Sequence, residues 1–312
     1  MPNPKCLECL NEITVKAVEL STTDVELRKR LIKEISDYTK EQFDCLKLPD
    51  FSTEIFSIIA QKTGTKDPFL QIKIESDDYF VKLIPKIEKS LSNLAQKEKL
   101  FKLVLYSIAA NMVDFSTGGH SVDLDEIAKN IDNFPKEGLA IDHFNELYDL
   151  VLKTDSIIYL SDNCGEVVVD NLVVKFLVNE LNKTVYFGLK GAPIANDCTM
   201  DDFVRDGLPE YATETFTVSS SFGWNLHQTS DRFNELIKEC DLLIVKGQSN
   251  FETTLNNLKR FPDFQFPPTF CIMRTKCDVI TGNLSVPLGS NIVRKMYPFN
   301  LNKDDSFKEI VD

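Results

Sequence analysis

Oxygen-bearing side chains gather in one short segment of this sequence. Asp162, Asn163 and Glu166 surround Gly165, directly after the apolar run Ile157–Leu160 and before a helical pattern. A strand-to-helix turn of this kind lies at the carboxyl end of a strand, where open α/β sheets bind ligands. The amide groups at the start of the following helix favour an anion. The segment is therefore suited to a hard cation and a phosphate.

Polar residues also follow the four later strands that the apolar runs predict, which are Thr184–Leu189, Thr215–Val218, Leu242–Val245 and Thr269–Met273. In chain order these residues are Asn196 and Asp197, then Ser220, then Lys246, Gly247 and Asn250, and finally Lys276. Each turn alone is typical of an ordinary loop. Because the ends of parallel strands share one edge, their recurrence predicts a common site.

The residue types at this edge divide into two groups. Asp162, Asn163 and Asp197 offer oxygen ligands of the kind that Mg²⁺ and similar hard divalent ions prefer. Lys246, Lys276 and the Gly- and Ser-rich turns offer donors for a phosphate. We expect Glu166 and Asn196 to lie next to the ion's ligands without binding the ion themselves, and to orient a ligand or a water molecule.

The elements that must position these residues alternate between strand and helix after about residue 155. Amphipathic segments at Glu166–Leu181, Met200–Arg205, Ser230–Cys240 and Phe251–Leu258 separate the strands. Such alternation predicts an α/β fold with a mainly parallel sheet covered on both faces. The earlier chain reads as helices near residues 6–20, 23–42, 52–64, 78–94, 97–113, 124–131 and 141–152. We therefore predict a helical domain over residues 1–153 and an α/β domain with the site over residues 154–312.

Composition narrows the classes of function. The chain has 312 residues and a formal net charge of −13, which argues against a nucleic-acid or anionic-membrane surface. No apolar run approaches the roughly 20 residues of a membrane span. The amino terminus lacks the apolar core of a signal peptide, and the eight cysteines are expected as reduced thiols. These features predict a cytoplasmic protein.

The motifs together resemble the metal-dependent damage-control phosphatase family, long catalogued as a domain of unknown function. The resemblance is carried by Asp162-Asn163-Cys164-Gly165-Glu166, by Asn196–Asp202, by Lys246–Glu252 and by Arg274-Thr275-Lys276-Cys277. It extends to Ala110–Phe115 and to Cys6-Leu7-Glu8-Cys9, and so spans most of the chain. Cys164 departs from the family pattern, in which Ala or Ser is commoner.

The resemblance implies a helical domain packed on a three-layer α/β/α sandwich with a Rossmann-like sheet. It implies Mg²⁺, Mn²⁺, Co²⁺ or Ni²⁺ bound by the equivalents of Asp162, Asn163 and Asp197. It places Asn111, Asp114, Lys246 and Lys276 on the phosphate and substrate side. Members of the family hydrolyse small phosphorylated metabolites, including sugar phosphates and damaged cofactor-like compounds.

Cys6 and Cys9 form a C-x-x-C pair, which raises zinc, iron–sulfur or redox chemistry. A second such pair is absent, so a site would need a partner such as Cys277. The alternative is that the two thiols share one helix face and pack as small apolar groups.

We therefore predict a divalent-metal-dependent phosphatase of small metabolites, in which a metal-activated water attacks the phosphorus. Asp162 as a covalent nucleophile, as in haloacid-dehalogenase-like phosphatases, is disfavoured because Cys164 occupies the position of the second aspartate. Two alternatives are a non-hydrolytic phosphometabolite-binding protein and a carboxyl methyltransferase that uses S-adenosylmethionine. The first strand is not followed by the glycine-rich motif of nucleotide-binding folds, which disfavours the transferase.

Overall fold

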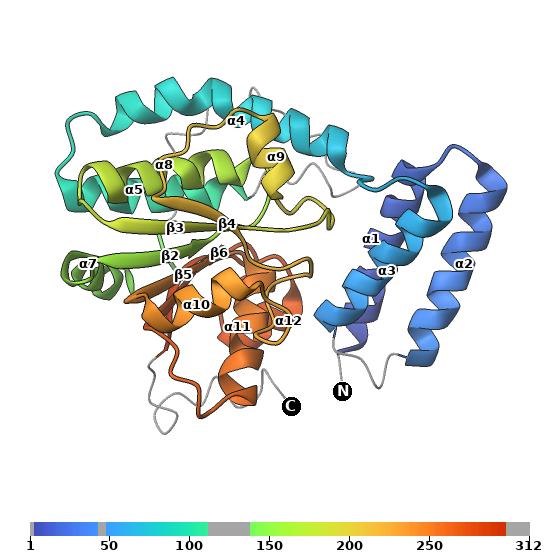
Figure 1. The fold of residues 1–312 in the computed structure, drawn as a ribbon. Coiled ribbons are helices and arrows are strands. Elements are labelled where there is room, and N and C mark those ends of the chain that lie inside the picture. Colours follow the sequence, from blue (N-terminus) through green and yellow to red (C-terminus); the bar gives the residue numbers. More distant parts are fainter. Residues whose placement is uncertain (1–2, 43–47, 112–137, 298–312) are drawn as a thin grey trace.

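The computed structural model describes residues 3–42, 48–111 and 138–297. Its helices are α1 (Pro4–Ser21), α2 (Val25–Gln42), α3 (Leu48–Thr63), α4 (Leu70–Leu91), α5 (Gln96–Ala110), α7 (Phe144–Lys153), α8 (Glu166–Asn179), α9 (Met200–Arg205), α10 (Asp231–Glu239), α11 (Gln248–Arg260) and α12 (Asp278–Leu284) (Figure 1). The strands are β1 (Ile141–Asp142), β2 (Ser156–Leu160), β3 (Thr184–Leu189), β4 (Glu214–Thr217), β5 (Leu242–Lys246), β6 (Thr269–Arg274) and β7 (Asn291–Tyr297).

The strands form one sheet in the order β1-β7-β6-β5-β2-β3-β4. The five strands from β6 to β4 pair in parallel, whereas β7 is antiparallel to β6 and β1 is parallel to β7. Chain order runs outward in opposite directions from the adjacent strands β2 and β5. This reversal is the topological switch point, outside which open α/β sheets bind ligands.

The sheet lies between two layers of helices because successive residues of each strand face opposite sides. Ile157 and Tyr159 of β2 enter a core shared with α5, α7 and α8. Ile158 and Leu160 enter a second core shared with α10, α11 and α12. Figure 1 shows α5 and α8 above the strands, α10, α11 and α12 below them, and α7 beside their left end. The predicted three-layer α/β/α sandwich with a mainly parallel sheet is confirmed.

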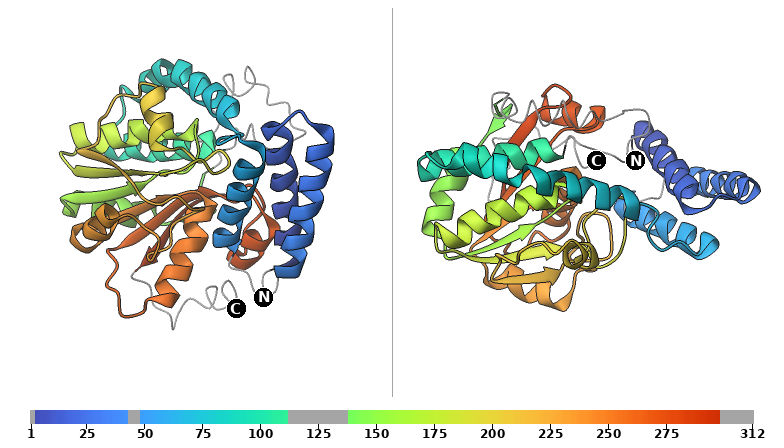
Figure 2. Two further views of the ribbon diagram at one scale, coloured as in Figure 1. Left: turned by 45° about the vertical axis from the view of Figure 1, so that its right-hand side comes forward. Right: turned by 90° about the horizontal axis from the view of Figure 1, so that it is seen from above.

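The amino-terminal helices divide into two groups. α4 packs on the outer side of α8 and shares the first core, whereas α1, α2 and α3 have a core of their own that includes Ile35 and Ile55. Figure 2 shows α1–α3 as a group beside the sandwich. Their core reaches the sandwich through Ala195 and Phe222, which lie in loops after β3 and β4. The helical region predicted from the sequence is therefore present.

Some elements were not predicted. β1, α12 and β7 are present in the structure although the sequence patterns did not indicate them. β1 joins the sheet and α7 packs against it, although both precede residue 154, where we expected the α/β domain to begin. The helix expected at residues 124–131 lies outside the described residues.

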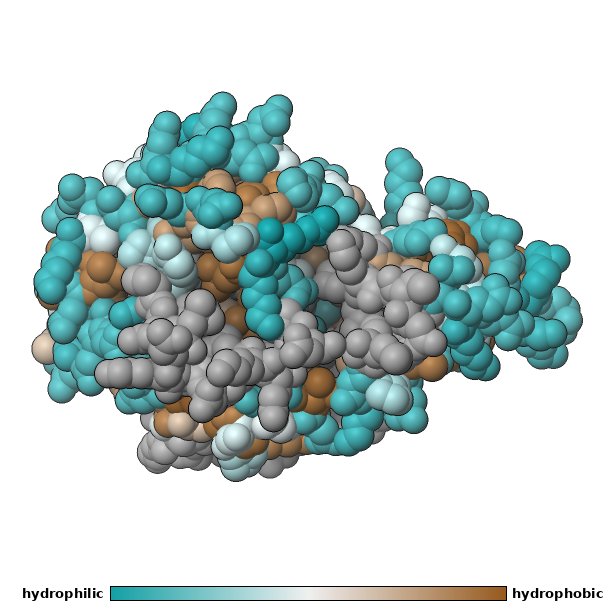
Figure 3. Space-filling model, turned by 90° about the horizontal axis from the view of Figure 1, so that it is seen from below, coloured by the Kyte–Doolittle hydropathy of each residue, from teal (hydrophilic) through white to brown (hydrophobic). Residues whose placement is uncertain are grey.

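One face of the molecule, seen in Figure 3, is mainly hydrophilic, as expected for a chain with a formal net charge of −13. Seen from below, the described residues present mainly hydrophilic side chains, with hydrophobic ones in small scattered groups (Figure 3). No helix among the described residues is long and apolar enough to cross a membrane.

Candidate functional site

The turn after β2 and the loop after β3 are joined by backbone hydrogen bonds. The Cys164 amide donates to the Asn196 carbonyl at 2.9 Å, and the Cys198 amide donates to the Asp162 carbonyl at 2.9 Å. Between these bonds Asn163 and Asp197 pair as an isolated antiparallel bridge. The sequence places these residues more than 30 positions apart, yet the fold sets their side chains beside one another.

Asp162 lies at the centre of this arrangement and is buried. Its Oδ2 accepts hydrogen bonds from the Nδ2 of Asn111 at 3.0 Å and from the Nδ2 of Asn163 at 2.8 Å. Burial, followed by the negative charges of Glu166 and Asp197, raises the pKa of Asp162 well above its usual range. The site thus holds carboxylates that repel one another, and a bound cation would relieve this repulsion.

Gly247 has no side chain, and the Asp162 carboxylate occupies the space beside its Cα atom. A Cβ atom at this position would overlap the carboxylate, and the backbone φ of 80° lies in the left-handed region that favours glycine. The turn after β5 therefore closes over the turn after β2 at the switch point.

Glu166 and Lys246 form a buried ion pair beneath the turn. Glu166 accepts from the amide of Asn111 and from the ammonium group of Lys246. Lys246 also donates to Asp170 at 3.0 Å. Burial lowers the pKa of Lys246, but the charges of Asp170 and Glu166 outweigh it and raise that pKa overall.

This placement differs from the predicted contact between Lys246 and the phosphate. The side chain of Lys246 is fully buried, and both carboxylates beside it balance its charge. Asp170 in turn accepts hydrogen bonds from Ser107 and Tyr159. In this structure Lys246 supports Glu166 from within the core.

Lys190 was not predicted as a site residue. It follows β3, and its ammonium group lies 3.6 Å from Asp197 Oδ2. It donates to the carbonyl oxygens of Ser221, at 3.0 Å, and Gly223. The Lys190-Gly191 dipeptide looked like an ordinary turn in the sequence, and only the position of the 219–223 loop reveals the role of the lysine.

Proteins with similar sequences indicate the family to which this chain belongs. Residues 3–292 match the family model of the damage-control phosphatase ARMT1-like domain. The chain belongs to this family. A damage-control phosphatase from Pyrococcus horikoshii is 29% identical over 287 residues, covering 92% of this chain and 95% of its own. A damage-control phosphatase from Archaeoglobus fulgidus is 23% identical over 295 residues, covering 94% of this chain and 98% of its own.

A solved structure extends the likeness to the fold. The crystal structure of a DUF89 family protein from Pyrococcus horikoshii superposes with a TM-score of 0.78 at 25% sequence identity. It covers 94% of this chain and 98% of that chain. The helical region and the sandwich of this damage-control phosphatase family member are therefore both shared with that structure.

The remaining predicted residues of this family member lie at the rim or in the backbone framework. Asn250 donates to the carbonyls of Ser161 and Lys246, at 3.0 and 2.7 Å, and so fixes the two turns. Ser220 and Lys276 are exposed. The positive charge of Lys276 lowers the pKa values of Asp162, Glu166 and Asp197, against the larger effect of burial. Asp114 lies outside the described residues.

The donor set fits the divalent ion that the resemblance implies. Asp197 Oδ2 is buried and has no hydrogen-bond partner within the described residues, so it is available to a further ligand. Burial raises the pKa of Asp197, against the opposing charge of Lys190. In the described part of the chain no three His, Cys, Asp or Glu side chains are placed to hold a metal by themselves. The amide of Asn163 and water molecules would have to complete the set.

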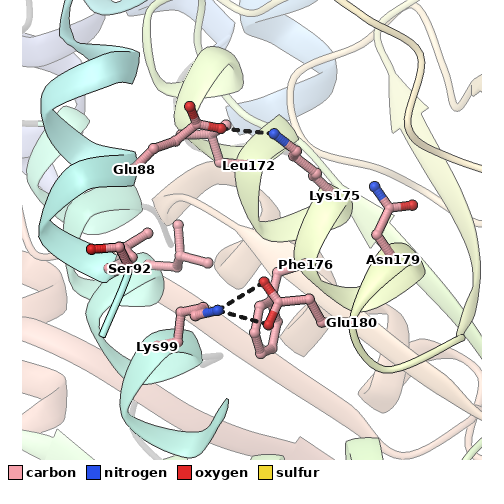
Figure 4. A pocket seen from close by; sticks show the side chains of 10 residues that line it. Glu88, Ser92, Lys99, Leu172, Lys175, Phe176, Asn179 and Glu180 are labelled. Atoms are coloured by element: carbon pink, nitrogen blue, oxygen red, sulfur yellow. Dashed lines mark hydrogen bonds and ion pairs between the residues drawn. The ribbon is translucent and has the colours of Figure 1, made fainter. Parts of the chain in front are cut away.

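A surface pocket lies away from this site. It has a volume of about 180 Å³ and lies between α4, α5 and α8 (Figure 4). Ion pairs cross it, with Glu88 to Lys175 at 2.7 Å and Lys99 to Glu180 at 2.8 Å. Since these lining charges are already paired and no strand end reaches the pocket, the switch point remains the candidate site.

Proposed function

We propose that this protein is a divalent-metal-dependent phosphatase that hydrolyses small phosphorylated metabolites. The observation that carries the proposal is the bridge between Asn163 and Asp197, which sets their side chains beside Asp162 at the switch point of the sheet. Two relatives are damage-control phosphatases, which supports phosphatase chemistry, and the buried, mutually repelling carboxylates support a cation.

Asp162, Asn163 and Asp197 would hold the ion. When bound there, a divalent ion supplies a Lewis acid that neutralises phosphate charge and lowers the pKa of water. Lys276, exposed at the rim, adds positive charge on the side from which a phosphate would enter. Asn111 orients Asp162 and Glu166 by donating to both. Burial raises the pKa of Glu166, and the charge of Lys246 opposes this rise.

The test is phosphate release from a generic aryl phosphate. We expect turnover with Mn²⁺, Co²⁺, Ni²⁺ or Mg²⁺ and none after chelation. Asp162→Ala should reduce kcat at least a hundredfold, because it removes a proposed ligand. Asp263→Ala, an exposed carboxylate in the loop after α11, serves as the matched control and should leave turnover unchanged.

Metal-independent turnover, or full activity of the Asp162→Ala variant, would overturn the proposal. Tight binding of a phosphorylated metabolite without any release of phosphate would instead favour a binding protein.

A further inference from the structure

Lys73 is a buried charged residue outside the candidate site. It lies in the first turn of α4, and its side chain has no exposed surface. Its ammonium group donates to Asp67 Oδ2 at 2.9 Å and to Asp202 Oδ2 at 3.0 Å. Burial lowers the pKa of Lys73, but the charges of Asp67 and Asp202 outweigh it and raise that pKa overall. Lys73 is therefore charged, and it joins two carboxylates from distant segments.

Both partners of Lys73 accept hydrogen bonds at the start of a helix. Asp67 Oδ1 accepts from the Phe69 amide at 3.0 Å, just before α4. Asp202 Oδ2, in the first turn of α9, accepts from the amide and the hydroxyl group of Thr199, at 3.0 and 2.7 Å. The Asp202 amide donates to Thr199 Oγ1 at 3.1 Å, which completes a capping box. One ammonium group thus connects the start of α9 to the start of α4.

The proposed ligand Asp197 lies two residues before Thr199, in the loop between β3 and α9. This loop is closed at its base, because the Lys190 amide donates to the Cys198 carbonyl and the Met200 amide donates to the Lys190 carbonyl, each at 3.0 Å. A chain spans at most about 3.6 Å per residue. The position of Thr199 therefore limits where Asp197 can lie.

A second attachment holds the other side of Asp197. Ala195 packs into the core of α1–α3, and its φ of 44° lies in the left-handed region, which is costly for alanine. The loop is therefore fixed on one side by apolar packing and on the other by the ion pair of Lys73. Neither attachment replaces the other, because they act on opposite sides of Asp197.

We propose that Lys73 is a positioning residue for the candidate site. Through Asp202 and Thr199 it holds the loop with Asp197 against the turn with Asp162, where the Cys198 amide donates to the Asp162 carbonyl. A buried ion pair is weak evidence for stability, because desolvation offsets the attraction of its charges. A role in specifying one arrangement of the chain accounts better for a buried cation shared by two helix starts.

Hydrogen–deuterium exchange of the metal-free full chain tests this placement, since it requires neither a metal nor turnover. We expect Lys73→Met to speed exchange about tenfold at the amides of Cys164 and Cys198, which donate across the two segments. Exchange in α10 should be unchanged, because α10 packs on the opposite face of the sheet. This comparison separates local loosening from a general loss of stability.

Asp67→Asn is the matched control. It removes the other carboxylate, keeps an oxygen for the Phe69 amide and leaves Lys73 paired with Asp202, so exchange at Cys164 and Cys198 should match the wild type. If Lys73→Met does not fold, Asp202→Asn takes its place. It breaks the same ion pair but leaves Lys73 paired with Asp67, and it should loosen the same two amides.

Wild-type exchange at Cys164 and Cys198 in the folded variant would overturn the proposal, and so would an equal increase in α10. The consequence for the ion rests on the proposed function: Kd for Mn²⁺, followed by electron paramagnetic resonance, should rise roughly tenfold in Lys73→Met and stay unchanged in Asp67→Asn. An unchanged Kd in Lys73→Met would overturn its role at the site. Exchange as expected in a protein that neither binds Mn²⁺ nor releases phosphate would refute the proposed function alone.

Discussion

At the scale of single residues, two buried lysines lie beside the proposed ligands and are compensated differently. Lys246 contacts two carboxylates, Glu166 and Asp170. Lys190 approaches one, Asp197, at 3.6 Å and otherwise donates to backbone carbonyls. Lys190 therefore links a proposed ligand, Asp197, to the 219–223 loop, and Asp197 is the one carboxylate among the described residues that it contacts.

Replacement of Lys190 tests this coupling. Lys190→Met should destabilise the metal-free protein by about 3 kcal/mol, because it leaves Asp197 as a buried carboxylate without a partner cation. The measurement is urea unfolding without added metal. Adding Asp197→Asn to the same variant should recover part of the loss, since neither charge then remains. Equal stability of Lys190→Met and the wild type would contradict the role of this pair.

Gly247 supplies a second prediction at this scale. Gly247→Ala should lower kcat more than tenfold, because the added methyl group displaces the Asp162 carboxylate. The matched control is Gly207→Ala, which has the same kind of positive φ, 59°, but no atom within 4 Å of the added Cβ. Gly207→Ala should cost about 1 kcal/mol of stability through backbone strain, and Gly247→Ala should cost more, because its methyl group also overlaps the buried Asp162 carboxylate. Equal activity losses in the two variants would show that strain, not displacement of Asp162, is responsible.

The sequence predicted part of the site for a clear physical reason. Asp162, Asn163 and Asp197 follow strands whose carboxyl ends share an edge, and the structure brings them together there. The direction of Lys246 was not predictable, because a residue at the last position of a strand points either to the crevice or to the core. Its partners, Glu166 and Asp170, become its neighbours only when α8 packs on the sheet.

At the scale of elements, the strands with continuous apolar runs were predicted closely. β7 was missed because Arg294 and Lys295 interrupt its apolar pattern, and its antiparallel pairing with β6 removes the strand–helix alternation. β1 has only two residues, Ile141 and Asp142, and carries no recognisable period. Short and charged strands are specified by the sheet that receives them.

α4 connects with the site through Asp77. The carboxyl group of this residue accepts from the amide of Gly165, at the start of α8, at 2.5 Å. Burial, with Asp206 as the second cause, raises the pKa of Asp77 to about 8. Arg205 lies 3.5 Å away but already contacts Asp202 and Asp206, so we regard its effect on Asp77 as small.

A pH dependence of stability follows from this shift. Between the unfolded pKa near 4 and the folded pKa of about 8, the folded protein holds a proton that the unfolded chain has lost. Stability from this residue therefore falls as pH rises through this window and levels off above it. Asp77→Asn should flatten that fall in urea unfolding between pH 5 and pH 8.5. An unchanged pH profile would contradict the raised pKa.

At the scale of the whole molecule, the group α1–α3 contacts the sandwich at the loops that flank the site. Phe56 of α3 packs edge-on against Phe222, with ring centroids 5.7 Å apart, and the Phe222 amide donates to Thr53 at 3.2 Å. Phe222 lies between Ser221 and Gly223, whose carbonyls bind Lys190. The helical group therefore steadies the loop that fixes Lys190.

Removing this contact should affect turnover as well as stability. Phe222→Ala should cost about 1–2 kcal/mol and lower kcat/KM severalfold, because the 219–223 loop loses its support. Phe264→Ala, which removes a partly buried aromatic side chain of the second core, is the control. It should reduce stability without a matching change in kcat/KM at a temperature where both variants are folded. Equal effects of Phe222→Ala and Phe264→Ala on kcat/KM would show that the helical group α1–α3 has no role at the site.

The position of the site between β2 and β5 also has a consequence for how the protein is made. β2 first pairs with β3, its neighbour along the chain, whereas its other edge pairs with β5, more than 80 residues later. Contacts between such distant segments form slowly, and the amino-terminal part of a chain emerges first during synthesis. Until β5 arrives, the turn with Asp162 has no Gly247 to close it and no Lys246 to balance Glu166. Function is therefore acquired late, as one of the last events of folding.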